Sequence, residues 1–251
     1  MFPFYCLYLT FVLIFKPLNS ADVNLKSEKK MQVEIWSDIV CPFCYIGKRK
    51  FEKALREFKH KDHVVVHWRS YQLDPIAESQ GHENAYAYLA RVKGQSLEWS
   101  VKMHQNVTEM AAAVGLDYHF EKAIVSNSHQ AHRLIQLARL KGIDADVEEL
   151  LFKAYFVEGK NIGDAETLVE LAAKVGLNTN EAREAVNTEK FSTAIKADIE
   201  AGEGFGLSGV PFFVFDRKFS VAGAQDSQVF LSALERSFEE FSSLNFQNAK
   251  K

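Results

Sequence analysis

The 251-residue chain is poor in cysteine, and this scarcity limits what its cysteines can do. Cys6 lies in an apolar N-terminal stretch, and the other two, Cys41 and Cys44, are separated by two residues. A structural zinc site needs a second pair of ligands at a suitable spacing. His63 and His67 follow the cysteines, but they flank a β-branched run that is typical of a strand. The sequence therefore argues against zinc and predicts no metal site.

An excess of one charge, an internal repeat and a long hydrophobic run are also missing. The formal net charge is −3, so nothing in the composition points to nucleic acid or an anionic membrane as a partner. Hydrophobic residues make up 47% of the chain and charged residues 25%, as in globular proteins with a core of their own. The longest apolar stretch, residues 2–15, is too short to span a bilayer comfortably. No stable membrane anchoring is therefore expected.

Residues 1–30 allow two interpretations. The apolar stretch is similar to the hydrophobic region of a secretory signal, which predicts a periplasmic or secreted protein if residues 1–21 act as a signal peptide. No Lys or Arg precedes the stretch and Lys16 follows it, which favours a translation start at Met31. In that case residues 1–30 are a leader and linker from a mis-called start, and the protein is expected in the cytoplasm.

What the chain does have is a Cys-Pro-Phe-Cys motif, residues 41–44, placed between a strand and a helix. Apolar and β-branched residues over 33–36 predict a buried strand. Apolar residues at helical spacing predict a helix over about 41–60, with Pro42 in the first turn, where a missing N–H is tolerated. The motif is therefore expected at the start of a helix.

This placement favours redox chemistry at the two cysteines. Unpaired N–H groups and the positive end of the helix dipole stabilise a thiolate. Cys41, nearer the helix end, is the expected attacking thiolate, and Cys44, one turn further in, is the expected resolving thiol. A purely structural disulfide is the alternative, but a three-residue step on a helix suits exchange better than crosslinking.

Apolar periodicity divides the rest of the chain into strands and helices. A glycine-rich loop leads to Pro211, which is a candidate for a cis peptide bond because it opens a strand. In chain order the pattern predicts a strand at 63–71, five helical stripes between 99 and 199, strands at 212–215 and 219–222, and a helix around 229–238.

From residue 31 to about 238, the chain resembles the DsbA-like branch of the thioredoxin superfamily, and its FrnE-type subgroup in particular. Five segments carry the resemblance: 37–48, 127–134, 152–159, 209–213 and 223–225. The resemblance implies an α/β protein with a thioredoxin fold and a large α-helical domain inserted after the second strand. The implied units are a leader and linker (1–30), the two parts of the thioredoxin fold (31–74 and 189–241), the helical insertion domain (75–188) and a polar tail (242–251).

The same resemblance implies roles for individual residues. Pro211 would be a cis-proline facing the disulfide, and Val210 would offer its backbone N–H and C=O to an extended substrate segment. Pro42 and Phe43 would help to set the redox potential. Because Phe43 cannot hydrogen-bond a thiolate as a histidine can, the protein is expected to be less oxidising than relatives with histidine there.

Other polar residues of the motifs have less definite roles. Asp38 could relay a proton for Cys44 or cap the helix end. His132 and Arg133 match a family pattern, and packing, capping or a surface ion pair are the roles expected for them. The implied activity is thiol–disulfide exchange with protein or small-molecule thiols and disulfides. It needs no bound metal or organic cofactor beyond the redox-active cysteine pair.

The sequence departs from its relatives in two respects, and two alternative functions stay open. No cysteine follows Cys44, which excludes the second cysteine pair that some FrnE-type proteins carry. Kappa-class glutathione transferases and 2-hydroxychromene-2-carboxylate isomerases share the fold but have serine at the position of Cys41. A glutathione-dependent transferase or isomerase is thus the first alternative, and a redox-inert peptide-binding adaptor or chaperone is the second. Glutathione is also a possible reductant, with Val210 on its cysteinyl backbone and Asp226 near its amino group.

Overall fold

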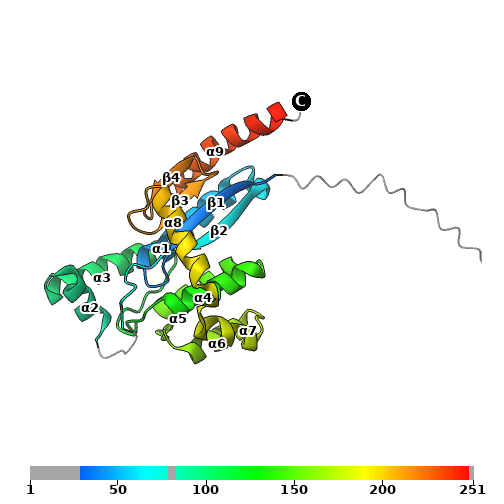
Figure 1. Cartoon of the computed structure of the whole chain (residues 1–251). Coiled ribbons are helices and arrows are strands. Elements are labelled where there is room, and N and C mark those ends of the chain that lie inside the picture. The colour runs from blue at the N-terminus through cyan, green and yellow to red at the C-terminus, as the bar shows by residue number, and fades with distance from the viewer. Residues whose placement is uncertain (1–28, 79–82, 249–251) are drawn as a thin grey trace, which may run out of the picture.

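The computed structural model describes residues 29–78 and 83–248, in which nine α-helices and two short 3-10 helices surround a four-stranded sheet (Figure 1). The expected leader and Cys6 lie outside the described residues, apart from positions 29 and 30. Within the described ranges, no helix is both long enough and apolar enough to cross a membrane.

The sheet has the strand order β2-β1-β3-β4. Strand β1 pairs in parallel with β2 and antiparallel with β3, and β3 forms a hairpin with β4. Helix α1 connects the parallel strands, as a crossover between them requires. The bounds are β1 Met31–Ser37, α1 Pro42–Glu57, β2 Val64–Ser70, β3 Phe212–Phe215 and β4 Phe219–Ala222.

Six helices lie between β2 and the element that leads back to the sheet. They form the lower part of the molecule in Figure 1, with α2 and α3 projecting to one side. Their bounds are α2 Ala85–Lys93, α3 Leu97–Ala112, α4 His129–Leu140, α5 Asp144–Phe156, α6 Ala165–Lys174 and α7 Thr179–Asn187. Helix α8 (Ser192–Gly204) then precedes β3, and α9 (Ser227–Asn248) follows β4. Two 3-10 turns cover Lys61–His63 and Glu189–Phe191.

The sequence prediction differs from the structure in three places. Helices α2 and α7 have no counterpart among the predicted stripes. Helix α9 continues to Asn248, into the segment expected to be a polar tail. In α3 the buried face carries His104, whereas Met110, an apolar residue within the predicted helical stripe, is 39% exposed.

Both faces of the sheet are covered because side chains of β1 alternate between them. Met31, Val33 and Ile35 pack with residues of α1 and α9 on one face. Trp36 faces the other side, where it packs with Leu207 and with partly buried residues of α8 and the loop after it. The central strands β1 and β3 are therefore buried on both sides, as in other α/β sheets.

Helix α1 belongs to two cores. Its first turns, including Tyr45 and Ile46, pack into the core of the inserted helices. Its later turns, with Phe51 and Ala54, pack into the core between the sheet and α9. The start of α1 therefore lies where the sheet and the inserted helices meet.

Gly202 in α8 provides a test of the packing around Trp36. A Cβ atom at Gly202 would lie 2.6 Å from Leu207 Cδ2 and 2.7 Å from Trp36 Nε1, and Trp36 Nε1 donates a hydrogen bond of 2.6 Å to the Asp198 carbonyl. We expect Gly202→Ala to lower the free energy of unfolding by about 1–3 kcal/mol, because the added methyl group overpacks the core. Urea unfolding measures the change.

Gly204, in the last turn of the same helix, is the matched control. A Cβ atom there meets no described atom within 4 Å. We expect Gly204→Ala to be neutral or slightly stabilising. Equal destabilisation by both substitutions would contradict the packing argument.

Candidate active site

The two cysteines lie at the first turn of α1. Cys41 is the N-cap residue with an extended backbone, and Pro42 opens the helix. The Cys41 N–H donates to the Asp38 carbonyl (3.0 Å), and the Cys44 N–H donates to the Cys41 carbonyl (3.0 Å). Cys41 is 3% exposed and Cys44 1% exposed, so the two side chains differ little in burial.

A distant part of the chain meets Cys41. Its Sγ lies 3.6 Å from the Val210 carbonyl oxygen, to which the thiol can donate. The Val210–Pro211 peptide bond is cis. A Cβ atom at Gly47 would lie only 3.0 Å from Pro211 Cγ, so the glycine allows α1 to approach the proline closely. The structure thus brings Cys41, Val210 and Pro211 together.

Cys44 is held as a thiol by its surroundings. Burial, a hydrogen bond from its thiol to Cys41 and the charge of Cys41 raise the pKa of Cys44 well above its usual value. The Asp38 backbone and the Ser37 hydroxyl act in the opposite direction. The second cysteine therefore keeps its proton, which suits a resolving thiol that reacts after the first cysteine.

Tyr118 forms a wall of the site that the sequence prediction missed. Its hydroxyl donates to the Pro42 carbonyl (2.8 Å), and its ring stacks against Tyr45 with centroids 6.2 Å apart. Burial raises the pKa of Tyr118, and the charge of Cys41 adds to this effect. Phe43, by contrast, is half-buried and packs on the core of the inserted helices. The only sequence signal for Tyr118 is that it lies in an aromatic-rich stretch of a loop.

Asp38 is fully buried beside the motif. One carboxylate oxygen accepts the Leu73 N–H at 2.7 Å, and the other lies 3.5 Å from the Val40 N–H. The N-cap of α1 has no side-chain hydrogen bond, so the side chain of Asp38 fastens the turn and the loop after β2 rather than capping the helix. A proton relay through Asp38 stays a prediction.

Two further residues named from the sequence lie elsewhere. Asp226 is exposed at the start of α9, where its carboxylate accepts the Gln228 N–H at 3.0 Å. Arg133 is buried, donates to the Val186 carbonyl (3.2 Å) and pairs with Glu189. Arg133 thus ties α4 to α7 and its following turn. A role for Asp226 with glutathione stays a prediction.

A buried polar cluster lies behind Cys44, and the sequence did not predict it. It consists of Ser37, His132 and Glu148, each at most 1% exposed. His132 Nε2 lies 3.4 Å from Asp38 Oδ1, without the geometry of a hydrogen bond. Burial raises the pKa of Glu148 to about 7, although Ser37 and His132 partly oppose the shift. The cluster places an acid that titrates near neutrality beside the motif.

A charged network holds α5 against α1. Tyr45 Oη donates to Glu149 at 2.6 Å, Lys48 Nζ lies 2.6 Å from the same carboxylate, and Arg49 also binds it. Burial opposes the ionisation of Glu149, but these three partners lower its pKa to about 2. Because Glu148 is the preceding residue, this network also fixes its position.

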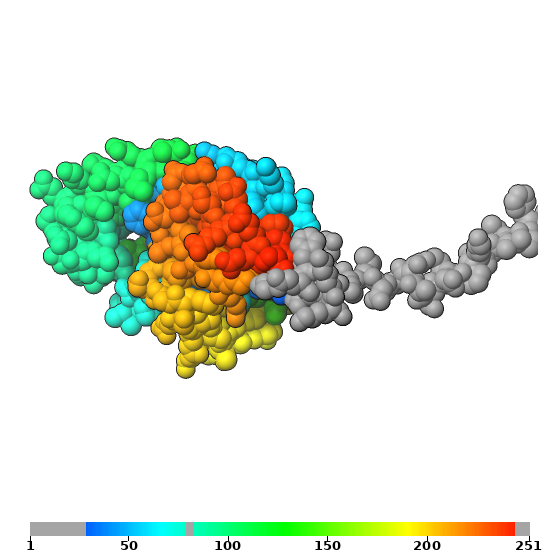
Figure 2. Space-filling view, turned by 90° about the horizontal axis from the view of Figure 1, so that it is seen from above, coloured from blue at the N-terminus to red at the C-terminus, as the bar shows by residue number. Residues whose placement is uncertain are grey.

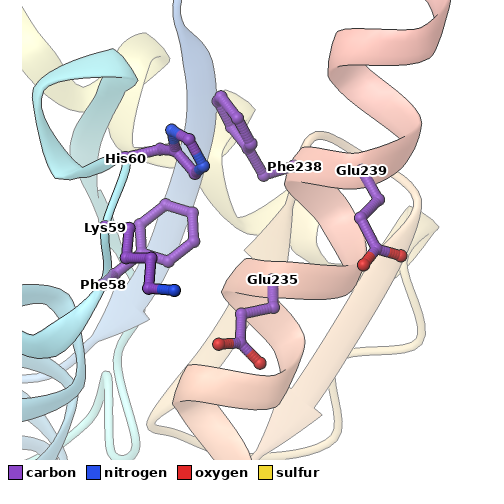
Figure 3. Close-up of a pocket in the computed structure, with 6 residues that line it drawn as sticks. All are labelled: Phe58, Lys59, His60, Glu235, Phe238 and Glu239. Atoms are coloured by element: carbon purple, nitrogen blue, oxygen red, sulfur yellow. The ribbon is translucent and has the colours of Figure 1, made fainter.

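A cavity lies at the end of α1 opposite to the cysteines. It has a volume of about 330 Å³, and Figure 3 shows His60 stacked on Phe238 across it. The other lining residues are Phe58, Lys59, Glu235 and Glu239. Helix α1 has 16 residues, so about 24 Å of helix separates this cavity from the cysteines.

Figure 2 shows a recess in another part of the surface. It lies between the green segment around α3 and the orange segment of β3 and β4, and blue atoms are visible in it.

Comparison with known proteins finds consistent likenesses. A family model described as a DSBA-like thioredoxin domain matches residues 32–235. The chain is 37% identical to a probable DsbA oxidoreductase from Streptomyces coelicolor, with a TM-score of 0.79, covering 84% of this chain and 91% of the other. It is 27% identical over 206 residues to the protein YwbO of Bacillus subtilis, covering 81% of this chain and 96% of that protein.

A more distant likeness concerns the fold alone. The structure of a 2-hydroxychromene-2-carboxylate isomerase superposes with a TM-score of 0.62 at 13% identity, covering 85% of this chain and 99% of the other. Together with the family match, these likenesses confirm the α/β thioredoxin fold with a helical insertion that the sequence predicts.

Proposed function

The chain belongs to the DSBA-like thioredoxin domain family, and from this premise we propose that it is a thiol–disulfide oxidoreductase whose redox centre is Cys41 with Cys44. One observation carries the proposal. The Cys41 thiol lies at the N-terminus of α1, 3.6 Å from the Val210 carbonyl, with Cys44 one turn behind it. A helix N-terminus favours a thiolate at the first position, and burial holds a proton on the second.

The chemistry proceeds through a mixed disulfide. The Cys41 thiolate attacks a substrate disulfide, and one substrate sulfur leaves as a thiolate. Cys44, after losing its proton, attacks Cys41 Sγ, and the second substrate sulfur leaves with its electron pair. The substrate gains two electrons and the protein gains a Cys41–Cys44 disulfide. The reverse sequence oxidises a substrate dithiol.

Val210 has a second task in this scheme. When Cys41 is a thiol, it donates a hydrogen bond to the Val210 carbonyl. Once Cys41 ionises, that carbonyl is released and can pair with an extended substrate segment, as in strand addition. Pro211 and Pro42 shape the surface that the segment meets. Glutathione is the reductant we propose, with its cysteinyl backbone on Val210 and its amino group near Asp226.

The reduction potential of the cysteine pair tests the proposal. The protein is equilibrated in graded glutathione buffers, and free thiols are counted at each ratio. We expect a reversible two-electron transition between roughly −120 and −270 mV. It should lie toward the reducing end, because Phe43 offers no hydrogen bond to the thiolate. A pair that never closes would contradict the proposal.

Substituting the resolving cysteine gives a sharper result. In Cys44→Ser the mixed disulfide at Cys41 cannot be resolved from within the protein, so it should accumulate. Mass spectrometry after incubation with oxidised glutathione should show one glutathione per chain, bound at Cys41. Cys6→Ser is the control and should not accumulate this adduct. Equal adduct levels in both variants would show that Cys44 is not the resolving thiol.

A further inference from the structure

The loop between α3 and α4 contacts the active-site turn through Tyr118. The Tyr118 hydroxyl donates to the Pro42 carbonyl at 2.8 Å, and the side chain is 4% exposed. Pro42 lies between the two cysteines, whereas Tyr118 belongs to the helical insertion. This hydrogen bond therefore joins the insertion to the central dipeptide of the Cys-Pro-Phe-Cys motif.

The Tyr118 ring is held by aromatic neighbours, which fixes the position of its hydroxyl. The ring stacks on Phe156 with centroids 4.6 Å apart and on Tyr45 at 6.2 Å, and it meets the Phe120 ring edge-on at 5.5 Å. The backbone of the loop is fastened to the same place, because the His119 N–H donates to the Phe156 carbonyl at 2.7 Å. A donor held in this way acts on one particular carbonyl.

The Pro42 carbonyl belongs to the same peptide group as the Phe43 N–H. Proline has no N–H, and the Cys44 N–H donates to the Cys41 carbonyl at 3.0 Å. Within residues 29–78 and 83–248, the Phe43 N–H has no hydrogen-bond acceptor. Of the first three residues of α1, only Phe43 therefore has an N–H available to a thiolate.

Cys41 is the residue placed to use this N–H. It is the N-cap of α1, and an N-cap side chain accepts from the N–H of the second or third helical residue. In the structure the Cys41 thiol instead lies 3.6 Å from the Val210 carbonyl, and the cap is not formed. A thiolate has no proton to donate to Val210, so ionisation frees the sulfur to accept from Phe43. The Phe43 side chain has no donor, but its backbone does.

A hydrogen bond at one end of a peptide group strengthens a bond at the other end. The donor at the carbonyl oxygen polarises the group, which makes its N–H more positive, and each bond in such a chain gains about 10–30%. The Tyr118 hydroxyl remains a donor because burial raises its pKa. Its bond to the Pro42 carbonyl thus makes the Phe43 N–H a stronger donor.

We propose that Tyr118 is a positioning residue that stabilises the Cys41 thiolate through the Pro42–Phe43 peptide group. The inference rests on the proposed function and assigns the helical insertion a part in setting the redox potential. The thiolate exists only in the reduced protein. The Tyr118 hydroxyl therefore favours the reduced form and raises the reduction potential of the cysteine pair.

Tyr118→Phe in the full chain carrying Cys6→Ser tests the proposal, because it removes the hydroxyl and keeps the ring. Alkylation of Cys41 by iodoacetamide, followed by mass spectrometry across a pH series, reports the thiolate. We expect the midpoint of this profile to move to higher pH by about 0.3 to 0.7. Above both midpoints, the equilibrium constant for reduction by glutathione should fall about two- to fivefold, which lowers the potential by about 10 to 20 mV.

Two further proteins make the result specific. Tyr86→Phe removes a half-buried hydroxyl that makes no hydrogen bond in the described part of the chain, and it should leave the midpoint and the potential unchanged. Fluorine on the ring beside the hydroxyl makes a phenol a stronger donor. Incorporation of 3-fluorotyrosine at position 118 should therefore shift both quantities in the opposite direction to Tyr118→Phe. If Tyr118→Phe does not fold, as judged by circular dichroism, the fluorinated protein decides the question.

Several results would overturn the proposal. An unchanged midpoint and potential in Tyr118→Phe would do so, and a lower melting temperature with both unchanged would leave Tyr118 a structural role only. Shifts of the same sign in Tyr118→Phe and the fluorinated protein would also contradict it. If the cysteine pair of the parent protein never closes in glutathione buffers, it is the proposed function that fails.

Discussion

Replacing Cys41 with serine is expected to lower the rate of thiol–disulfide exchange by at least about 1000-fold, to near the uncatalysed rate. The thiolate is the nucleophile, and a serine hydroxyl neither ionises near neutral pH nor forms a bond that a thiol can exchange. The remaining Cys44 cannot substitute, because its pKa is raised well above its usual value. The measurement is the enzyme-dependent reduction of a small disulfide-bonded peptide by dithiothreitol.

The comparison with other cysteine variants makes this loss interpretable. Cys6→Ser should retain the parent rate, and Cys44→Ser should be slower than the parent protein, because dithiothreitol must then resolve the mixed disulfide at Cys41 from outside. Serine is close to cysteine in size, so Cys41→Ser should keep the melting temperature within a few degrees. Full exchange activity in folded Cys41→Ser would remove the basis of the functional assignment.

The buried acid Glu148 should make stability depend on pH. Its pKa is about 7 in the folded protein against 4.5 as its ordinary value, so the protonated form is the one that folding favours. The stability contribution is complete below about pH 4.5 and is lost as the pH rises through about 7. The difference corresponds to about 3 kcal/mol. Glu148→Gln, which stays neutral, should not lose this amount.

Urea unfolding of both proteins from about pH 5 to about pH 8 measures the effect, since titrations common to both cancel in the difference. The free energy of unfolding of the variant should rise relative to the wild type across this range. Asp146→Asn, an exposed acid on the same helix, should give a flat difference. A flat difference for Glu148→Gln would show that folding does not raise the pKa of this carboxyl.

The sheet and the start of α1 could be predicted because their patterns are local. The hairpin of β3 and β4 has the bounds that its aromatic and β-branched runs indicate, and β2 lies within the predicted strand 63–71. Asp164, a residue type that favours the N-cap position, caps α6 by accepting the Thr167 N–H at 2.8 Å. Each of these features depends on residues close together in the chain.

The two missed helices are short and bury small side chains. Helix α7 buries Ala182, Ala185 and Val186, and α2 buries Ala85 and Ala90. Alanine at helical spacing gives a weak apolar stripe, and the polar residues between obscure it. Their helical state depends on tertiary packing rather than on a visible local pattern.

The cluster behind Cys44 was hidden for a different reason. Glu148 sits between Val147 and Leu151 on a helix, where an acid is ordinarily assigned to the solvent face. Only the packing of α5 against α1 and β2 turns it inward, next to Ser37. The site thus depends on three elements that no motif connects, whereas the Cys-Pro-Phe-Cys motif and Val210–Pro211 could be read from the sequence.

Because two cores share α1, their unfolding is coupled. Ile46 anchors the helix in the core of the inserted helices, and Phe51 anchors it in the core under α9. If either core unfolds, α1 loses the packing contacts that it makes there. Because the other core also contains α1, partial unfolding of one core lowers the stability of the other. The inserted helices and the sheet should therefore melt as one cooperative unit rather than as two, despite the length of the insertion.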